Sequence, residues 1–414
     1  PPHGAFRGFG APQSLFAVER HMEHIAQVVG LSPIEIRRRN FLQPGQTTTT
    51  DQTIREAIDL EKLLDRALEV SDYHSKKQRF SKENQMGTSK KGIGVAAFLH
   101  GAGFTGSGER NLGSVVDVEA CADGTVRVLV SSTEFGQGTK TVLCQIAAET
   151  LGLDYDDVTI AQADTGEVPN SGPTVASRTV MVVGKLVQSA ALGIKQTLTT
   201  SGALERSYSP AEFRTACQNY VAAHGTFRSS ARFEAPSDVF WDDEKYRGEA
   251  YAAFAWAVYV AEVTVDLSTY SVSVNDLVAL QEVGKVLHPV LARGQIVGGI
   301  AQGIGYTLYE KVIWQNGRMQ NSQMTNYIMP TSADLPPIRV FFEEMGNIHG
   351  AFGAKGIGEL PMDGPAPSII NAVEDALQIR FDAIPLLPED IFEKLATETI
   401  SKSGPHSAGG VQSQ

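Results

Sequence analysis

Four glycine-rich segments constrain what this chain can fold into more than any other feature of its sequence. They lie at residues 133–138, 169–177, 298–305 and 353–359; three precede an apolar helix and one lies inside such a helix. Glycines at the start of a helix let backbone N–H groups approach an anion closely, and the helix end adds partial positive charge. Any single segment is explained more simply as a tight turn or a close helix contact. Together, the four suggest a large anionic cofactor that is held by many hydrogen bonds.

Polar residues near these glycines are the candidate functional groups, because the segments match neither a P-loop nor a dinucleotide-binding fingerprint. Gln302 lies in an otherwise apolar helix, where a cofactor or a neighbouring backbone group could equally satisfy its amide. Glu359 lies among small apolar residues, and desolvation there would raise its pKa toward that of a useful general base. A solvent-exposed turn is the alternative for Glu359. Glu109 and Glu134 are interpreted as surface or capping residues.

The composition excludes several classes of protein. Of 414 residues, 42% are apolar and 20% are charged, so a large core can be buried. With 35 Lys and Arg against 47 Asp and Glu, the net charge of −12 argues against a general nucleic-acid binder. The apolar residues 250–261 are too few to cross a bilayer, and three widely separated cysteines encode neither a disulfide framework nor a thiolate metal cluster. We expect a soluble, cytoplasmic protein that binds neither nucleic acid nor a membrane.

The character of the sequence changes near residue 91, where we place the main boundary. Amphipathic helices are predicted within residues 13–41 and 51–70, and the polar, basic residues 76–91 are predicted to be a linker. Beyond the boundary, the sequence favours strands and glycine-rich turns. Residues 401–414, rich in Ser and Gly, are predicted to be a disordered tail.

Strands are predicted at several places after this boundary. Residues 114–120 and 125–131 alternate apolar and polar side chains around an Asp-Gly pair, which is a strong hairpin signal. Residues 250–265 and 270–281 are predicted to be long strands. The polar and aromatic residues 205–245 are interpreted as an irregular crossover.

Five short motifs carry a resemblance to a known family. In chain order they are Phe6-Arg7-Gly8-Phe9-Gly10-Ala11-Pro12-Gln13, Glu134-Phe135-Gly136-Gln137-Gly138, Gly172-Pro173-Thr174-Val175-Ala176-Ser177, Ala301-Gln302-Gly303 and Lys355-Gly356-Ile357-Gly358-Glu359. Their order across residues 5–375 is specific, and on it the chain resembles the molybdenum hydroxylases, the xanthine dehydrogenase and aldehyde oxidoreductase family. The resemblance implies an α+β fold of molybdopterin-binding domains. Residues 1–75 would be the C-terminal remnant of a first such domain, and residues 92–400 would form a second.

The resemblance also implies the cofactor and the residues around it. The cofactor is molybdopterin with molybdenum, in the cytosine dinucleotide form that is usual in bacteria. Arg7 and Ala176 are cofactor-site residues near the molybdenum, without being its ligands, and Phe9 stacks on or edges a planar substrate. Glu359 is the catalytic base. The other cofactor contacts are Gly136, Gln137, Ser177 and Gln302.

The reaction implied by the resemblance is hydroxylation of an electron-poor carbon, with the oxygen taken from water. Residues 98–108 and 168–185 look most like those of bacterial purine or N-heterocycle hydroxylases, so a purine or related heterocycle is the expected substrate. An aldehyde-oxidising subunit is the first alternative, and a non-catalytic scaffold that holds a cofactor or partner is the second. Glu359 discriminates, since a scaffold needs no carboxylate beside the metal. Residues 94–108 align too loosely to receive roles.

Partner chains are a further implication of the resemblance. The sequence contains neither the family's Gly-Gly-Phe-Gly-Gly type of cofactor motif nor its iron–sulfur and flavin domains, and it opens directly on the Arg7 motif. We therefore expect a second molybdopterin-binding chain or N-terminal half, together with a 2Fe-2S subunit and an FAD subunit that accept the electrons, in a dimer of heteromers. Expressed alone, the chain is expected to be aggregation-prone or free of cofactor, because an apolar wall of its cleft would be exposed.

Overall fold

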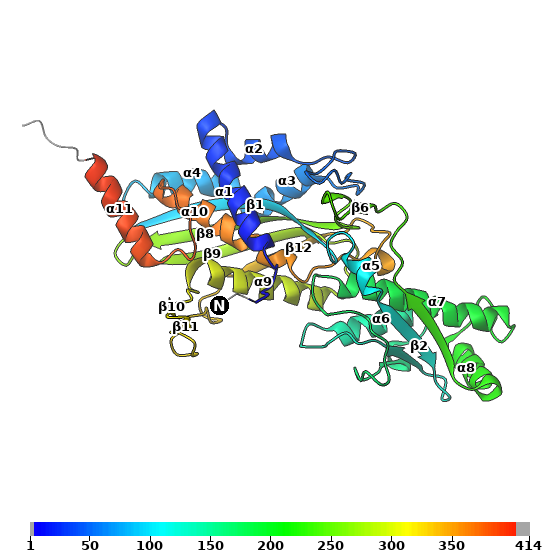
Figure 1. Cartoon of the computed structure of the whole chain (residues 1–414). Helices are drawn as coiled ribbons and strands as arrows, with labels where there is room; N and C mark the ends of the chain where they lie inside the picture. The colour runs from blue at the N-terminus through cyan, green and yellow to red at the C-terminus, as the bar shows by residue number, and fades with distance from the viewer. Residues whose placement is uncertain (1–3, 403–414) are drawn as a thin grey trace, which may run out of the picture.

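A four-stranded mixed sheet forms the centre of the larger part of the molecule (Figure 1). The computed structural model describes residues 4–402. The strand order is β1-β8-β9-β12, with β8 antiparallel to both β1 and β9, and β12 parallel to β9. The bounds are Ser89–Gly101 for β1, Phe254–Asp266 for β8, Val272–Glu282 for β9 and Ile338–Glu343 for β12. The two long strands predicted at residues 250–265 and 270–281 are confirmed.

Helices cover both faces of this sheet, which explains why β8 is apolar along nearly its whole length. Alternate residues of a strand point to opposite faces. Ala257 and Tyr259 pack toward α9 (Pro289–Leu308) and α10 (Pro365–Leu377). Trp256 and Val258 pack on the other face, in a cluster with apolar residues of α3 (Leu60–Ser71) and α4 (Tyr73–Glu83). Two separate apolar layers therefore enclose one sheet, and the fold is α+β as expected.

Helix α10 lies directly against β1, because two glycines remove the side chains that would separate them. A Cβ placed on Gly94 would lie 2.3 Å from the backbone nitrogen of Ala372, and one on Gly92 would lie 1.9 Å from its carbonyl oxygen. Asn371 on the same helix donates from Nδ2 to the carbonyl of Val95 at 2.8 Å. This contact fixes the start of α10, and therefore the turn that precedes it.

A second sheet lies to one side, with the order β4-β3-β2-β5 and its own apolar core (Figure 1). Its strands are β2 (Val115–Ala120), β3 (Val126–Leu129), β4 (Val158–Ile160) and β5 (Phe227–Arg232). Helices α6 (Thr139–Leu151), α7 (Gly184–Thr200) and α8 (Pro210–His224) pack against it. The antiparallel pairing of β2 with β3 confirms the predicted hairpin.

The interpretation of residues 205–245 as an irregular crossover is wrong. This segment contains α8 and β5, followed by the short hairpin of β6 (Trp241–Asp242) and β7 (Arg247–Gly248). Helix α8 begins with a capping box, in which Ser209 and Glu212 bond each other's backbone, and with Pro at its first position. These are sequence signals for a helix start, and the low apolar content of the segment obscured them.

The N-terminal part is mostly helical, as expected, but two of its predicted bounds are wrong. Helices α1 (Ala11–Val29) and α2 (Pro33–Asn40) confirm the helices within residues 13–41. The helix predicted over 51–70 begins only with α3 at Leu60. Residues 76–91 are not a linker, since α4 occupies them to Glu83 and β1 begins at Ser89. Tyr73 and Phe80, seven residues apart on α4, are buried beneath its basic face.

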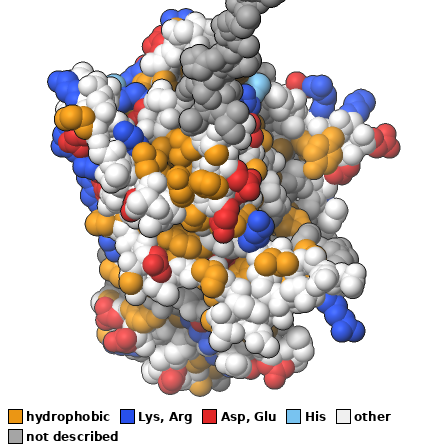
Figure 2. All heavy atoms as spheres, turned by 90° about the vertical axis from the view of Figure 1, so that its left-hand side faces the viewer, with side chains coloured by type: hydrophobic (Ala, Val, Ile, Leu, Met, Phe, Trp, Pro, Cys, Tyr) orange, Lys and Arg blue, Asp and Glu red, His pale blue; other side chains and the backbone are white. Residues whose placement is uncertain are grey.

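The remaining elements are short or peripheral. They are α5 (Gly108–Leu112), the hairpin of β10 (Trp314–Gln315) and β11 (Arg318–Met319), and α11 (Pro388–Lys402). A disordered tail is predicted at residues 401–414. Residues 401 and 402 are the last two of α11, and residues 403–414 lie outside the described residues. The face at the end of the molecule that carries α11 shows apolar side chains among acidic and basic ones (Figure 2), which is normal for a folded surface.

Gly94→Ala tests the contact between α10 and β1. The added Cβ would overlap backbone atoms of α10, so the helix must shift, and we expect a loss of about 1–3 kcal/mol in the free energy of unfolding. Gly294→Ala is the control, because a Cβ there meets nothing within 4 Å and the position is helical. Equilibrium denaturation should show a neutral or slightly stabilised control, and a Gly94 variant as stable as the wild type would contradict this account.

Candidate active site

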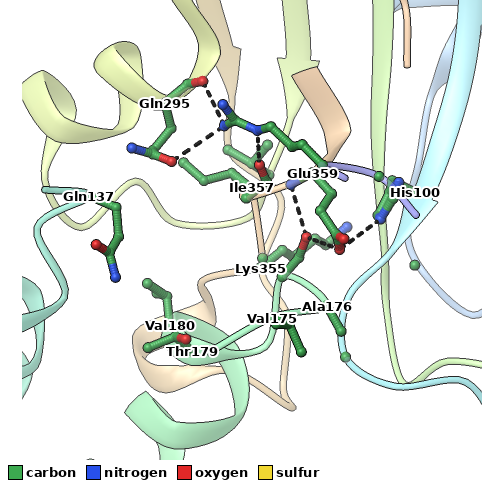
Figure 3. A pocket seen from close by; sticks show the side chains of 18 of the residues that line it. His100, Gln137, Val175, Ala176, Thr179, Val180, Gln295, Lys355, Ile357 and Glu359 are labelled. Atoms are coloured by element: carbon green, nitrogen blue, oxygen red, sulfur yellow. Dashed lines mark hydrogen bonds and ion pairs between the residues drawn. The ribbon is translucent and has the colours of Figure 1, made fainter. Parts of the chain in front are cut away.

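A cavity of about 1170 Å³ is lined by segments from both parts of the fold. Its walls come from the N-terminal segment around Arg7, the end of β1, the turn before α6, the loop before α7, helix α9 and residues 354–359. Figure 3 shows side chains from several of these segments pointing toward a shared space. All four glycine-rich segments therefore contribute to one cavity.

Arg7 joins three of these segments. Its Nε donates to the carbonyl of Gly358 at 2.5 Å, and Nη1 donates to Oε1 of Gln302 at 3.1 Å. Its Nη2 donates to the carbonyl of Gln295 at 3.0 Å and to that residue's Oε1 at 3.3 Å. Burial lowers the pKa of Arg7 from its usual value, while the charges of Glu359 and Asp363 oppose that effect. The guanidinium thus ties the N-terminal segment to α9 and to the turn that carries Glu359.

A buried lysine, Lys355, fixes the turn at residues 354–359 to the central sheet. Lys355 Nζ donates to Oε2 of Glu282 at 2.5 Å and to the carbonyl of Phe254 at 2.8 Å. The backbone of Lys355 also donates to the carbonyl of Val283, just after β9. These bonds hold residues 354–359 against the ends of β8 and β9, so the turn is a rigid continuation of the central sheet.

The loop before α7 is fixed by a second buried ion pair. Arg178 donates to both oxygens of Glu109, at 2.9 Å from Nε and 2.8 Å from Nη2, and to the carbonyl of Ser171. Ala176 and Ser177 both adopt left-handed conformations, with φ of 54° and 52°. Non-glycine residues hold such conformations only when the surroundings enforce them. The interpretation of Glu109 as a surface or capping residue is wrong, because it is buried by this pairing.

Ser177 and Glu359 meet through a reciprocal pair of hydrogen bonds. Ser177 Oγ donates to Oε2 of Glu359 at 3.0 Å and accepts from the backbone N–H of Glu359 at 3.0 Å. The approach is close because Gly356 has no side chain: a Cβ there would lie 1.8 Å from the carbonyl oxygen of Ser177. His100 Nε2 lies 3.4 Å from the same Oε2 (Figure 3). The Glu359 carboxylate is therefore held from two sides at the cavity wall.

The pKa of Glu359 is shifted in the direction opposite to the one expected from the sequence. Burial is the largest single cause and would raise the pKa, as predicted. The contact with His100, the charge on that ring and the hydrogen bond from Ser177 together outweigh burial, so the pKa lies below its usual value. The expectation of a raised pKa is wrong because the sequence did not reveal these two partners. Glu359 is ionised at neutral pH.

The turn before α6 uses its backbone N–H groups internally. Glu134 accepts from the N–H groups of Gly136 at 2.8 Å, Gly138 at 3.0 Å and Lys140 at 3.0 Å. Glu134 is therefore a capping residue, as interpreted. Gln137 lines the cavity, but its amide bonds the backbone of residues 133 and 135 and Oγ1 of residue 139. The cofactor contacts predicted for Gly136 and Gln137 stay predictions.

Phe9 lines the same cavity and is largely exposed to solvent. Its side chain is 76% exposed, and its backbone is left-handed with φ of 45°. The structure thus brings Arg7, Phe9, Gln302 and Glu359 together with the remaining predicted residues at one cavity.

Sequence reasoning missed several residues of the site. His100, Gln295 and Thr179 line the cavity, and Asp363 lies behind it. His100 could have been noticed, since it is a titratable residue at the end of an apolar strand. Gln295 could have been noticed as a second amide on the helix that carries Gln302. Thr179 begins a π-helical turn, Thr179–Val183, which no local pattern announced.

Comparison with known proteins identifies the family. A sequence model described as molybdopterin cofactor-binding domain matches residues 66–336, and a second model with the same description matches residues 1–41. The chain belongs to this family. The resemblance to xanthine dehydrogenases and aldehyde oxidoreductases that the sequence motifs indicated is confirmed.

Relatives and solved structures agree with this assignment. The xanthine dehydrogenase molybdenum-binding subunit of Escherichia coli O157:H7 is 31% identical over 95% of this chain and 54% of its own length. Aldehyde oxidoreductase of Megalodesulfovibrio gigas is 29% identical over 94% of this chain and 41% of its own length. The crystal structure of quinoline 2-oxidoreductase from Pseudomonas putida 86 superposes with a TM-score of 0.83 at 29% identity, covering 95% of this chain and 53% of that one. The chain thus spans about half the length of these relatives.

The residues present fit a large polar organic cofactor. The polar lining includes one guanidinium, the amides of Gln137, Gln295 and Gln302, and hydroxyl and backbone groups. Such groups hydrogen-bond a pterin or a phosphate in many directions. The other charged or titratable side chains of the lining are those of His100, Lys285, His288, Lys355 and Glu359. The cavity volume of about 1170 Å³ exceeds that of most single-ligand pockets.

Among residues 4–402, none of the helices has the length and apolar character of a membrane span.

Arg7→Lys tests whether the forked guanidinium is needed. A lysine keeps the charge but cannot reach α9 and the Gly358 carbonyl together, so we expect a loss of about 1–3 kcal/mol in the free energy of unfolding. Arg39→Lys is the matched control, because Arg39 is exposed and, within residues 4–402, its ion pair is with Glu35 on its own helix. Denaturation of both variants should separate them, and equal stability would show that Arg7 does not tie the segments together.

Proposed function

We propose that this chain carries the catalytic base of a molybdenum-dependent hydroxylase that acts on a purine or a related N-heterocycle. The observation that supports this most is the ionised Glu359 carboxylate, held at the wall of a large polar cavity by Ser177 and His100. A scaffold that only holds a cofactor has no need for such a group. The names of the relatives, which include xanthine dehydrogenase and quinoline 2-oxidoreductase, support an N-heterocycle as substrate.

Each residue at the cavity has its own role in the proposed reaction. Glu359 accepts a proton at Oε1 or Oε2 during attack of the water-derived nucleophile on the substrate carbon. Arg7 and Gln302 hold the cofactor side of the cavity, and Phe9 presents an aromatic ring to a flat substrate. Ser177 keeps the carboxylate in one orientation, so that a proton is accepted from one direction.

The molybdenum cofactor would supply the two-electron oxidising centre. We propose that Arg7, Gln137, Ser177 and Gln302, with the backbone at Gly136 and Ala176, hold it, in its cytosine dinucleotide form. Electrons would pass to partner subunits that carry 2Fe-2S clusters and FAD, and a second molybdopterin-binding chain or N-terminal half would complete the site in a dimer of heteromers. Mass spectrometry of the nucleotide released from the purified complex tests the dinucleotide form.

An aldehyde is the second candidate substrate, and the similarity to aldehyde oxidoreductase favours it. The two candidates differ in shape, because a heterocycle is planar and an aldehyde need not be. A screen of purines, nicotinate and aldehydes with the assembled complex separates them.

Glu359→Gln tests the base. The amide keeps the shape of the carboxylate but cannot accept the proton, so turnover should fall by about 10²–10⁴-fold. Molybdenum content, measured by elemental analysis, should stay near that of the wild type. Glu343→Gln is the control, since Glu343 pairs with Arg66 outside the cavity and should leave turnover unchanged. Retained turnover in the Glu359 variant, or loss of the metal with it, would show that Glu359 is structural.

Phe9→Ala tests the substrate contact. Because the ring is largely exposed, its removal should leave the thermal midpoint almost unchanged. Binding of a planar substrate should weaken by about 1–3 kcal/mol through lost aromatic contact, and KM should rise accordingly. Steady-state kinetics and thermal unfolding measure the two effects. A large fall in the thermal midpoint would instead identify Phe9 as a packing residue.

A further inference from the structure

His100 bridges two carboxylates at the end of β1. Its Nδ1 lies 2.7 Å from Oδ2 of Asp363, and its Nε2 lies 3.4 Å from Oε2 of Glu359. The His100 side chain is 10% exposed, and that of Asp363 is fully buried. The three groups therefore form a line from the interior of the fold to the cavity wall.

Only the doubly protonated ring can donate to both carboxylates. A neutral imidazole has one N–H and one lone pair. When Asp363 is ionised, its short contact keeps a proton on Nδ1, so a neutral ring would turn the lone pair of Nε2 toward an ionised Glu359 oxygen. That arrangement is repulsive, and it would be relieved by rotation or protonation of Glu359. With both carboxylates ionised, the observed geometry therefore favours the charged ring.

The charged and titratable groups around His100 and its two carboxylates come from four elements. Asp363 precedes α10, Glu359 belongs to the turn at 354–359, Arg7 comes from the N-terminal segment and Tyr259 from β8. Burial would lower the pKa of His100, but the hydrogen bonds and charges of Asp363 and Glu359 outweigh it and raise the pKa to about 9. Within residues 4–402, Asp363 Oδ1 has no hydrogen-bond partner, so this buried carboxylate depends on the bond from His100.

We propose that His100 is the positioning residue for Glu359. Its charged ring, fixed from behind by Asp363, holds the Glu359 carboxylate ionised and turned toward the cavity. Asp363 acts through His100, since it does not line the cavity itself. This role rests on the proposed function of Glu359 as the base, although the charge state of the ring can be tested without any reaction.

The charge of His100 determines how the reaction rate should change with pH. With His100 charged, Glu359 stays ionised well below neutral pH, and the rate should have no acid limb between pH 5 and 8. Without the ring's charge, burial is left as the largest influence on Glu359, so its pKa rises and an acid limb enters this range. In the wild type, the rate should fall as His100 loses its proton near pH 9.

The first experiment measures the ring directly. The full chain is labelled with ¹⁵N-histidine, and the ring nitrogens are followed by NMR from pH 6 to 10, with His100→Gln used to assign the signal. We expect a charged His100 ring at pH 7 that titrates near 9, and a midpoint lower by at least about one pH unit, a tenfold change in proton affinity, in Asp363→Asn. A His100 ring that is neutral at pH 7 in the wild type would overturn the proposal.

The second experiment measures the effect on turnover in the assembled, cofactor-loaded complex. His100→Gln keeps a donor near Glu359 but cannot carry a charge. Its rate should fall about tenfold from pH 8 to pH 5 and should lack the wild-type decrease near pH 9. His24→Gln is the matched control, because His24 is also buried and lies beside acidic groups, Glu374 and Asp382, outside the cavity. It should keep the wild-type pH profile.

The outcomes separate the two proposals. If Glu359→Gln loses activity but His100→Gln keeps the wild-type pH profile, the role of His100 is wrong and that of Glu359 stands. If Glu359→Gln keeps full activity, the proposed function is wrong, whatever the charge of the ring. Should His100→Gln fail to fold, the wild-type titration and its change in Asp363→Asn still decide the proposal.

Discussion

The position of the Glu359 carboxylate depends on the direct contact of α10 with β1. Gly92 and Gly94 allow the helix backbone to lie against the strand, and this places the start of α10 beside the strand's C-terminal end. His100 lies at that end, and Asp363 lies just before the helix. One packing contact therefore sets the separation of His100 and Asp363, which lie behind the Glu359 carboxylate. A side chain at Gly92 or Gly94 would push α10 away from β1 and would therefore move Asp363, which is about 270 residues away in the sequence.

The burial of Glu359 and the charge of His100 have opposite effects on the pKa of Glu359. Their balance decides whether this carboxylate is ionised. Burial alone would raise the pKa of Glu359, which would make it a stronger base but leave less of it ionised. The ring of His100 and the hydroxyl of Ser177 keep it ionised, at the expense of basicity. In its proposed role as base, an ionised Glu359 can accept a proton at neutral pH, and its effectiveness then depends on its orientation. That is consistent with the strained, left-handed backbone at Ala176 and Ser177, which costs about 1–3 kcal/mol per residue and fixes the hydroxyl.

Features that depend on a local pattern, or on an ordered set of motifs, could be predicted from the sequence. The β2–β3 hairpin, the strands β8 and β9, and the gathering of the glycine-rich segments at one cavity all follow from such signals. Helix α8 and the buried pairing of Glu109 with Arg178 did not follow. A polar segment can fold when its few apolar residues share one face, and a buried ion pair joins residues that are 69 positions apart. His100 belongs to the second kind, because its partners come from the other end of the chain.

Long-range pairings of this kind also explain why the N-terminal segment matters to the site. Arg7 contacts groups that are 288 to 351 positions away, and no contact within its own segment could replace them. The guanidinium bonds the carbonyl of Gly358, the residue before Glu359, so a shift of the N-terminal segment is transmitted directly to Glu359. The charge of Arg7 also acts on both Glu359 and Asp363. Helix α9 and the turn that carries Glu359 are thus connected through one side chain, and neither can be rearranged without the other.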